Sequence, residues 1–192
     1  MARRPPKPPK RTTLDVVTVH RSPLDRRRGR IVAGPLVLPC ALGRSGPTRD
    51  KREGDGATPV GRFRALQAFY RADRVRRPRA RLPLAPIRAD DGWCDDPRDR
   101  NYNRPVRLPY PAGHERMARD DGLYDVVLDL AWNRGPVRKG RGSAIFLHCA
   151  RPGFTPTEGC VAIDPNAIAR LLARIGPRTM VEVGGRPSPR RK

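Results

Sequence analysis

The stretch FLHCARPGFTPTEGCVAI, residues 146–163, contains two short apolar runs separated by an irregular loop rich in proline, glycine and threonine. This pattern predicts two strands joined by a loop. His148 lies near the end of the first run, and Cys160 opens the second run twelve positions later. Adjacent strand ends would bring the two side chains together. A thiol beside an imidazole is a recognised pair of nucleophile and base.

Working outward, apolar segments predict further strands at 14–20, 62–70, 124–132 and 180–183. In the segment 124–132, alternation places Val126, Leu128 and Leu130 on one face and Val127 on the other.

The apolar stretch 31–42 is interrupted by Pro35 and Pro39, which predicts two short or edge strands there.

One helix is predicted over residues 165–175. Asp164 is a suitable N-cap, and Pro165 suits the first helical position. An apolar stripe follows at the i, i+3, i+4, i+7 spacing, and Gly176 and Pro177 end the helix. The stripe is formed by Ile168, Leu171, Leu172 and Ile175.

The chain of 192 residues is long enough for one domain with its own core, which we place at 13–185. Residues 1–12 form a basic proline-rich tail expected to be disordered, and residues 186–192 form a second basic tail. Twenty-three prolines and 18 glycines are scattered along the chain, which favours short strands and turns and predicts a mainly β fold.

The formal charge of +22 has two interpretations. It indicates an anionic partner such as nucleic acid, an envelope polymer or a membrane surface, or it reflects arginines dispersed over solvated faces. No stripe of basic residues alternates with aromatic residues. The sequence also lacks an apolar run of transmembrane length, and its start has no apolar signal-peptide region that we recognise.

The four cysteines form no Cys-x-x-Cys motif, so we predict neither a metal site nor a cofactor. The acids between residues 90 and 99 lack calcium-loop spacing and are expected to pair with arginines. The glycine-rich loop 43–61 lacks the phosphate-binding motif. Cys40, Cys94 and Cys149 are interpreted as structural, and no role is assigned to His20 or His114.

The residues around His148 and Cys160 suit acyl transfer. Gly159 permits a tight turn before the nucleophile, and backbone amides near Gly159 and Cys160 can face an oxyanion. A buried structural cysteine and histidine would show the same spacing. The spacing therefore leaves both interpretations open.

The segment resembles the active-site signature of the L,D-transpeptidase (YkuD-type) catalytic domain. Thr157, Gly159 and Cys160 match its Ser/Thr, glycine and nucleophile positions, and His148 matches its general base. The segment GDGATPVGRF at 54–63 is similar to the Thr-Pro-x-Gly turn of the family.

The stretch containing Trp93, Asp96, Pro97, Tyr102 and Asn103 resembles a proteobacterial-style subgroup, and the whole resemblance spans residues 14–184. It implies a β-sandwich or barrel-like catalytic domain carrying the one helix.

Two positions depart from the family pattern. Glu158 stands where the family usually has histidine, and Ala162 stands where a charged residue is usual. We expect Glu158 to accept a hydrogen bond from Thr157 or an arginine, to contact a substrate amine, or to be an exposed loop acid. Arg151 is either a surface residue or a partner for a substrate carboxylate, and Thr157 is a third candidate contact to substrate.

The resemblance implies a monomeric enzyme of the cell envelope that transfers acyl groups between peptidoglycan stem peptides, the donor and the acceptor. His148 would activate Cys160, and a backbone carbonyl is expected to orient His148. Two alternatives stay open. One is an L,D-carboxypeptidase or amidase using the same pair, and the other is a silent basic protein that binds nucleic acid or another anionic polymer. Nucleic acid is not the favoured partner.

Overall fold

The computed structural model describes residues 13–184, so the expectations for the two tails lie outside the described residues. The first half of this region contains strands β1 (Val16–Arg21), β2 (Arg28–Ala33), β3 (Leu36–Ala41), β4 (Pro47–Thr48), β5 (Thr58–Pro59), β6 (Gly61–Tyr70), β7 (Leu84–Pro86) and β8 (Asp91–Cys94). The second half contains β9 (Pro105–Arg107), β10 (His114–Arg116), β11 (Val126–Leu130), β12 (Phe146–Cys149), a 3-10 turn (Pro152–Phe154), β13 (Val161–Ile163), α1 (Pro165–Leu172) and β14 (Met180–Val183).

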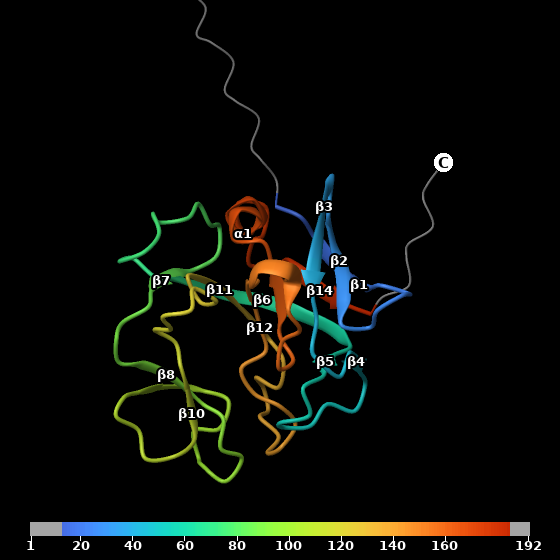
Figure 1. Ribbon diagram of the computed structural model, residues 1–192. Coiled ribbons are helices and arrows are strands. Elements are labelled where there is room, and N and C mark those ends of the chain that lie inside the picture. The colour runs from blue at the N-terminus through green and yellow to red at the C-terminus, as the bar shows by residue number, and fades with distance from the viewer. Residues whose placement is uncertain (1–12, 185–192) are drawn as a thin grey trace, which may run out of the picture.

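The main sheet has the strand order β11-β12-β13-β3-β2-β1-β14-β6-β7 and closes on itself because β6 also pairs with β11 (Figure 1). The ten-residue strand β6 makes this closure possible. Its first residues pair with β14, and its later residues pair with β11. The mainly β, barrel-like fold with one helix is therefore confirmed.

Strands β2 and β3 correspond to the two short strands predicted around Pro35 and Pro39. They are not edge strands, because β3 lies between β2 and β13. The pairing of β3 with β13 reaches only Cys40 and Ala41. Pro39 therefore lies beyond the end of β13, where its missing N–H interrupts no ladder on that side.

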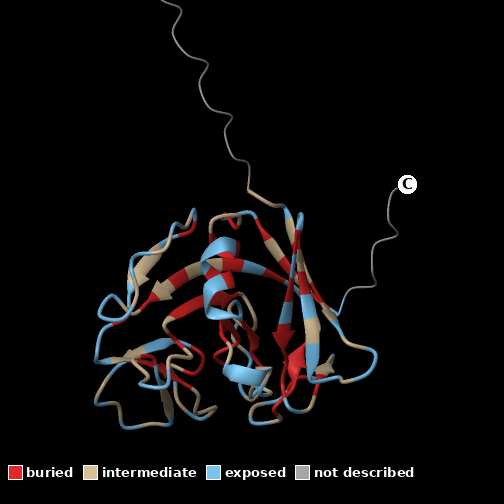
Figure 2. Cartoon of the chain, turned by 45° about the horizontal axis from the view of Figure 1, so that its top comes forward, coloured by how far each residue is buried: buried red, intermediate tan, exposed pale blue. Residues whose placement is uncertain are grey.

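The main sheet has an apolar core on each of its two faces. Buried residues lie mainly along its strands (Figure 2). The predicted alternation in β11 is confirmed. Val126, Leu128 and Leu130 belong to the main core, whereas Val127 belongs to the smaller core beneath β8. The smaller core also contains Cys160, so one side of the catalytic candidate is apolar.

Helix α1 begins as predicted, with the Asp164 side chain accepting a 2.8 Å hydrogen bond from the Asn166 amide. It ends at Leu172, three residues before the predicted end. Ile175 is nevertheless fully buried, because the turn after the helix keeps it against the main core. The helix packs on β11 and β12 and supports the strand that carries His148.

The three-stranded sheet β10-β8-β9 lies beside the barrel-like sheet. The predicted pairing of its acids with arginines holds for Asp90 and Asp91, which both contact Arg107, and for Asp96, which contacts Arg98. Asp95 instead lines a cavity. Among the described residues, no helix is long and apolar enough to cross a membrane.

Candidate active site

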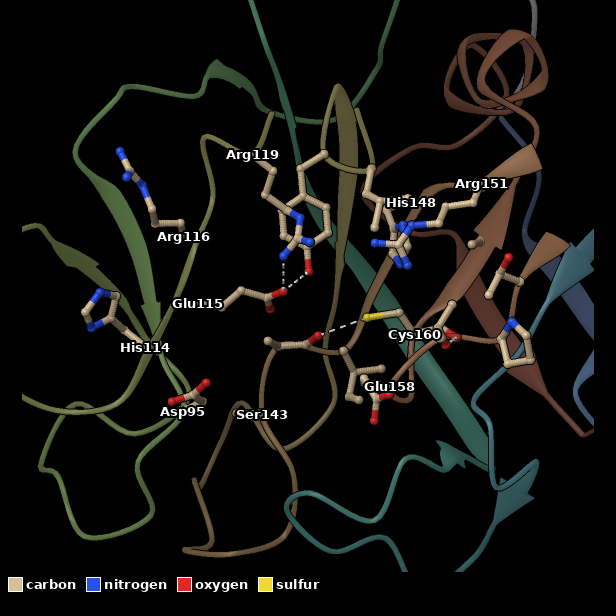
Figure 3. Close-up of a pocket in the computed structure, with 18 of the residues that line it drawn as sticks. Asp95, His114, Glu115, Arg116, Arg119, Ser143, His148, Arg151, Glu158 and Cys160 are labelled. Carbon is tan, nitrogen blue, oxygen red and sulfur yellow. Dashed lines mark hydrogen bonds and ion pairs between the residues drawn. The ribbon is translucent and has the colours of Figure 1, made fainter. Parts of the chain in front are cut away.

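Parallel pairing of β12 and β13 brings the two parts of the opening segment together. Leu147 pairs with Val161 and His148 with Ala162, which leaves Cys160 just before the start of β13. His148 and Cys160 line one cavity of about 570 Å³ (Figure 3). Cys149 belongs to the main core, as expected from strand alternation. The sequence therefore correctly predicted that the imidazole and the thiol come together. They are not at adjacent strand ends, because the parallel register puts Cys160 level with Phe146, at the start of β12, and His148 near its end.

The Cys160 thiol is held by the backbone that precedes β12. Its sulfur donates to the Ala144 carbonyl over 3.2 Å and accepts from the Phe146 amide over 3.3 Å. Burial raises the pKa of this thiol to about 12, and the charge of Glu115 acts in the same direction. The Cys160 thiol is therefore uncharged at neutral pH.

His148 is buried, and its Nδ1 lies 2.8 Å from the Cys149 carbonyl. A carbonyl only accepts, so Nδ1 carries the proton and Nε2 is free to act as a base. This contact provides the backbone carbonyl expected to orient His148. Burial lowers the pKa of His148 to about 4, although the Cys149 carbonyl partly opposes the shift. Both members of the pair are uncharged at neutral pH.

Gly159 has φ of +133°, and a Cβ at this position would lie 2.8 Å from the Ala57 carbonyl oxygen. The turn before Cys160 therefore requires glycine. The Gly159 amide donates to Thr157 Oγ1 over 3.2 Å, and the same hydroxyl donates to the Cys160 carbonyl over 2.7 Å. Thr157 thus braces the turn from within.

The other two segments that carry the family resemblance converge on Cys160, one at its main-chain carbonyl and one, through Ala144, at its thiol. Thr58, in the Thr-Pro-Val-Gly turn, donates to the Cys160 carbonyl over 3.4 Å. The Asn103 side chain accepts from the Trp93 indole and from the Ala144 amide, each over 3.1 Å. Ala144 in turn supplies the carbonyl that holds the thiol proton.

The two remaining sequence candidates lie at the rim of the cavity. Glu158 forms an ion pair with Arg44, with 2.8 Å between Oε2 and Nε, so the expected contact with an arginine is present. Arg151 is half-exposed and pairs with Asp121 over 3.1 Å. Both side chains line the cavity and are open to solvent.

Sequence reasoning missed several charged groups in this cavity. The additional ionisable side chains are Glu53, Asp95, His114, Glu115, Arg116 and Arg119. They come from the loop 43–61 and the β8–β11 region, which are far from Cys160 in the sequence. The segment around Glu115 looks like an ordinary charged loop, so no local signal identified it.

Lys51 was also missed, although it is only 2% exposed. It pairs with Asp55 over 2.5 Å, and its Nζ lies 3.4 Å from the point that a Gly159 Cβ would occupy. The loop 43–61 therefore packs against the turn before Cys160 with the buried Lys51 as well as with Thr58. A buried lysine has no distinctive signature in so basic a sequence.

The L,D-transpeptidase catalytic domain (YkuD) matches residues 23–183, which is most of the chain. The chain belongs to this family.

Two solved structures are similar at 14% identity. One is Mycobacterium tuberculosis L,D-transpeptidase 1, with a TM-score of 0.39 and coverage of 91% of this chain and 62% of that chain. The other is Bdellovibrio bacteriovorus Bd1075, with a TM-score of 0.44 and coverage of 88% and 48%. The chain thus spans 62% of the length of the first protein and 48% of the length of the second. No curated protein sequence is significantly similar to it.

Proposed function

We propose that this chain is a cysteine-dependent L,D-transpeptidase that transfers an acyl group from one peptidoglycan stem peptide to another through a thioester. The observation that carries the proposal is the shared cavity of Cys160 and His148, in which Nε2 is the free nitrogen of the imidazole. Membership in the L,D-transpeptidase catalytic domain family supports the same reaction class. The proposal places the enzyme in the cell envelope, acting as a monomer and without a cofactor.

In the first half-reaction, Cys160 attacks the donor carbonyl while its proton passes to His148 Nε2. The amide C–N bond then breaks, and the His148 proton goes to the departing amine. Because burial holds the thiol and the imidazole uncharged, His148 acts as a general base during the attack and not as a preformed ion-pair partner.

The backbone amide of Cys160 is the proposed donor to the oxyanion, with Gly159 shaping the turn. The Gly159 amide donates to Thr157 Oγ1 in this structure. It could donate to the oxyanion only after a local rearrangement that breaks this hydrogen bond. The two hydrogen bonds of the Thr157 hydroxyl favour a positioning role for this residue over direct substrate binding.

Charged side chains at the cavity rim suit a substrate that carries both signs of charge. Arg151 is the proposed partner of a donor carboxylate, because a guanidinium binds carboxylates in a fork geometry. Arg119 shares the Asp121 carboxylate with Arg151 and lines the same cavity, so it can serve beside it. Glu158 is the proposed rim contact for a substrate amine.

The test is intact-mass analysis after exposure to a carbapenem, which mimics the acyl donor. The wild-type chain should gain one covalent adduct, and Cys160→Ser should gain none. Cys149→Ser is the matched control and should retain the adduct, because Cys149 lies in the main core. A folded wild-type protein that forms no adduct would overturn the proposal.

Incubating the acyl-enzyme with stem peptide or with water alone separates transpeptidase from carboxypeptidase activity. A cross-linked product supports the proposal, and exclusive hydrolysis supports the carboxypeptidase alternative.

A further inference from the structure

Glu115 enters the active-site cavity from the small sheet and not from the barrel-like sheet. It lies on β10, opposite Trp93 of β8. In Figure 3, Glu115 and Cys160 extend into the cavity from opposite sides. Glu115 is therefore an acid–base group of this cavity that a different structural unit from that of His148 supplies.

The hydrogen bonds of Glu115 leave part of its carboxylate uncommitted. Its Oε1 accepts from the Tyr124 hydroxyl over 2.7 Å and from Arg119 Nη1 over 3.4 Å. Both contacts use the same oxygen, so Oε2 takes no part in them. These two partners fix the orientation of the carboxylate while one oxygen stays available to a ligand.

Tyr124 connects this carboxylate to the catalytic pair. Its ring meets the His148 ring edge-on, with centroids 5.4 Å apart, and Tyr124 itself is 4% exposed. The side chain that positions Glu115 thus also packs against the proposed general base. The separation of Glu115 from His148 is therefore fixed by a buried aromatic residue.

The charge of Glu115 does not favour activation of the nucleophile. Its carboxylate raises the pKa of Cys160, which opposes thiolate formation. Burial raises the pKa of Glu115 itself, while the Tyr124 hydroxyl and Arg119 partly oppose that shift. A carboxylate with a raised pKa is a better base than an ordinary surface acid.

Glu115 shares the cavity with two other acids as well as with Arg116 and Arg119. Glu53 and Asp95 line the same space, and their mutual repulsion adds to burial in raising the pKa of Asp95. A cation entering this part of the cavity would relieve the repulsion. The cation that the second half-reaction brings is the ammonium group of the acyl acceptor.

We propose that Glu115 is the catalytic base for the acyl acceptor, binding its ammonium group and removing its first proton. This inference rests on the proposed function and divides the reaction between two bases. Glu115 takes one proton from the ammonium, and the neutral nitrogen attacks the thioester carbonyl. The new C–N bond forms, the C–S bond breaks, and the second proton passes through His148 to the Cys160 sulfur. Glu115 then releases its proton to solvent.

The experiment compares the wild-type chain with Glu115→Gln, in which the amide oxygen can still accept from Tyr124. Acyl-enzyme is prepared with a donor stem peptide, and its decay is followed by mass spectrometry with each of two amines. Nα-acetyl-lysine is charged at neutral pH and needs a base, whereas hydroxylamine is already uncharged. The matched control is Glu182→Gln on β14, an acid that pairs with Arg62 away from the cavity.

In Glu115→Gln, transfer to Nα-acetyl-lysine should fall by about 10²-fold, the lower range of general-base contributions. Acyl-enzyme formation and transfer to hydroxylamine should not fall. Equal transfer to Nα-acetyl-lysine in both proteins would overturn the role of Glu115 while leaving the transpeptidase proposal intact. Failure of the folded variant to form acyl-enzyme would also overturn it, because the residue would then act in the first half-reaction.

If the wild-type chain forms no acyl-enzyme, the proposed function itself fails. Glu115→Asp provides a second variant that keeps the negative charge but withdraws the carboxylate from the acceptor. It should show the same selective loss with Nα-acetyl-lysine. Full activity of Glu115→Asp with this amine would contradict a positioned base.

Discussion

Thr58 donates a 3.4 Å hydrogen bond to the main-chain carbonyl of Cys160, although 102 positions separate the two residues. The same hydroxyl accepts a 2.8 Å hydrogen bond from the Gly43 amide. Thr58 is fully buried, so water cannot easily take the place of its hydroxyl in either hydrogen bond. The Thr-Pro-Val-Gly turn is thereby tied to the backbone of Cys160.

Replacing Thr58 with valine should destabilise the fold by about 1–3 kcal/mol, because the Gly43 amide loses its buried acceptor. The Cys160 carbonyl keeps its contact with Thr157. Urea unfolding measures the change. Thr58→Ser retains the hydroxyl and should lose much less stability. A loss in Thr58→Ser as large as that in Thr58→Val would show that packing of the methyl group contributes as much as the hydrogen bonds, and would contradict the prediction.

Gly159→Ala should abolish acylation of Cys160 and destabilise the chain by more than about 2 kcal/mol, since a clash of the new Cβ with the Ala57 carbonyl adds to the strain of the positive φ. Gly153 is a matched control, because it also has a positive φ, of +76°, but open space around its missing Cβ. Gly153→Ala should cost only the strain of the left-handed φ, about 1–2 kcal/mol, and keep acylation. Thermal unfolding and the carbapenem adduct are the two readouts, and an active Gly159→Ala variant would contradict the steric argument.

Alkylation of Cys160 in the free enzyme should be slow at neutral pH and rise about tenfold per pH unit through the alkaline range, because only the thiolate reacts. The raised pKa, about 12, predicts no plateau near neutrality. Peptide mapping after iodoacetamide treatment distinguishes Cys160 from the buried Cys40 and Cys149. A rate plateau between pH 6 and 8 would instead reveal a preformed thiolate–imidazolium pair.

His148 should make the fold acid-sensitive. Its pKa is about 4 in the folded chain, below the usual 6.5, so the unfolded chain binds more protons between these values. The stabilising contribution is complete above pH 6.5 and is lost as the pH falls through 4, by up to about 3 kcal/mol. Asp129, with a pKa raised by burial to about 6, acts in the opposite direction in the same window.

The contribution of His148 is therefore isolated by comparing the wild-type chain with His148→Asn, whose side-chain amide can still donate to the Cys149 carbonyl. The free energy of unfolding, measured at pH 7 and pH 4, should fall further in the wild type than in the variant. Parallel losses in the two proteins would mean that His148 titrates normally in the fold.

Arg151→Ala should raise KM for the donor stem about tenfold with little change in kcat, the loss expected for one charge-assisted hydrogen bond made equally in the ground and transition states. Steady-state kinetics provides the measurement. The control is Arg62→Ala on β6, where the arginine pairs with Glu182 away from the cavity. A fall in kcat at constant KM would assign Arg151 to the transition state instead.

The sequence was sufficient wherever the relevant interaction is local. Alternation placed the two faces of β11, and the capping residue Asp164 fixed the start of α1. The spacing of His148 and Cys160 across one loop allowed parallel strands to bring them together. These features depend on backbone periodicity and short-range hydrogen bonds, which nearby residues specify.

The end of α1 was not predicted correctly, and the sequence left open whether β3 is a short strand or an edge strand. Ile175 continues the apolar stripe, but its burial is achieved by a turn and not by another helical residue. The proline positions suggested an edge, yet β13 covers β3 only beyond Pro39. In both cases a part of the chain distant in sequence decides the outcome. The main core buries Ile175, and β13 pairs with β3.

The sequence by itself determined the mainly β character, the nucleophile candidate and the base candidate, because each depends on the pattern of residues within a short segment. Only the tertiary structure decided which charges surround them. Glu115 and Tyr124 reach the cavity from β10 and the turn before β11, and Thr58 reaches the Cys160 carbonyl from the loop 43–61. Such placements depend on how the small sheet and the loop pack against the closed sheet, and no local periodicity encodes that packing.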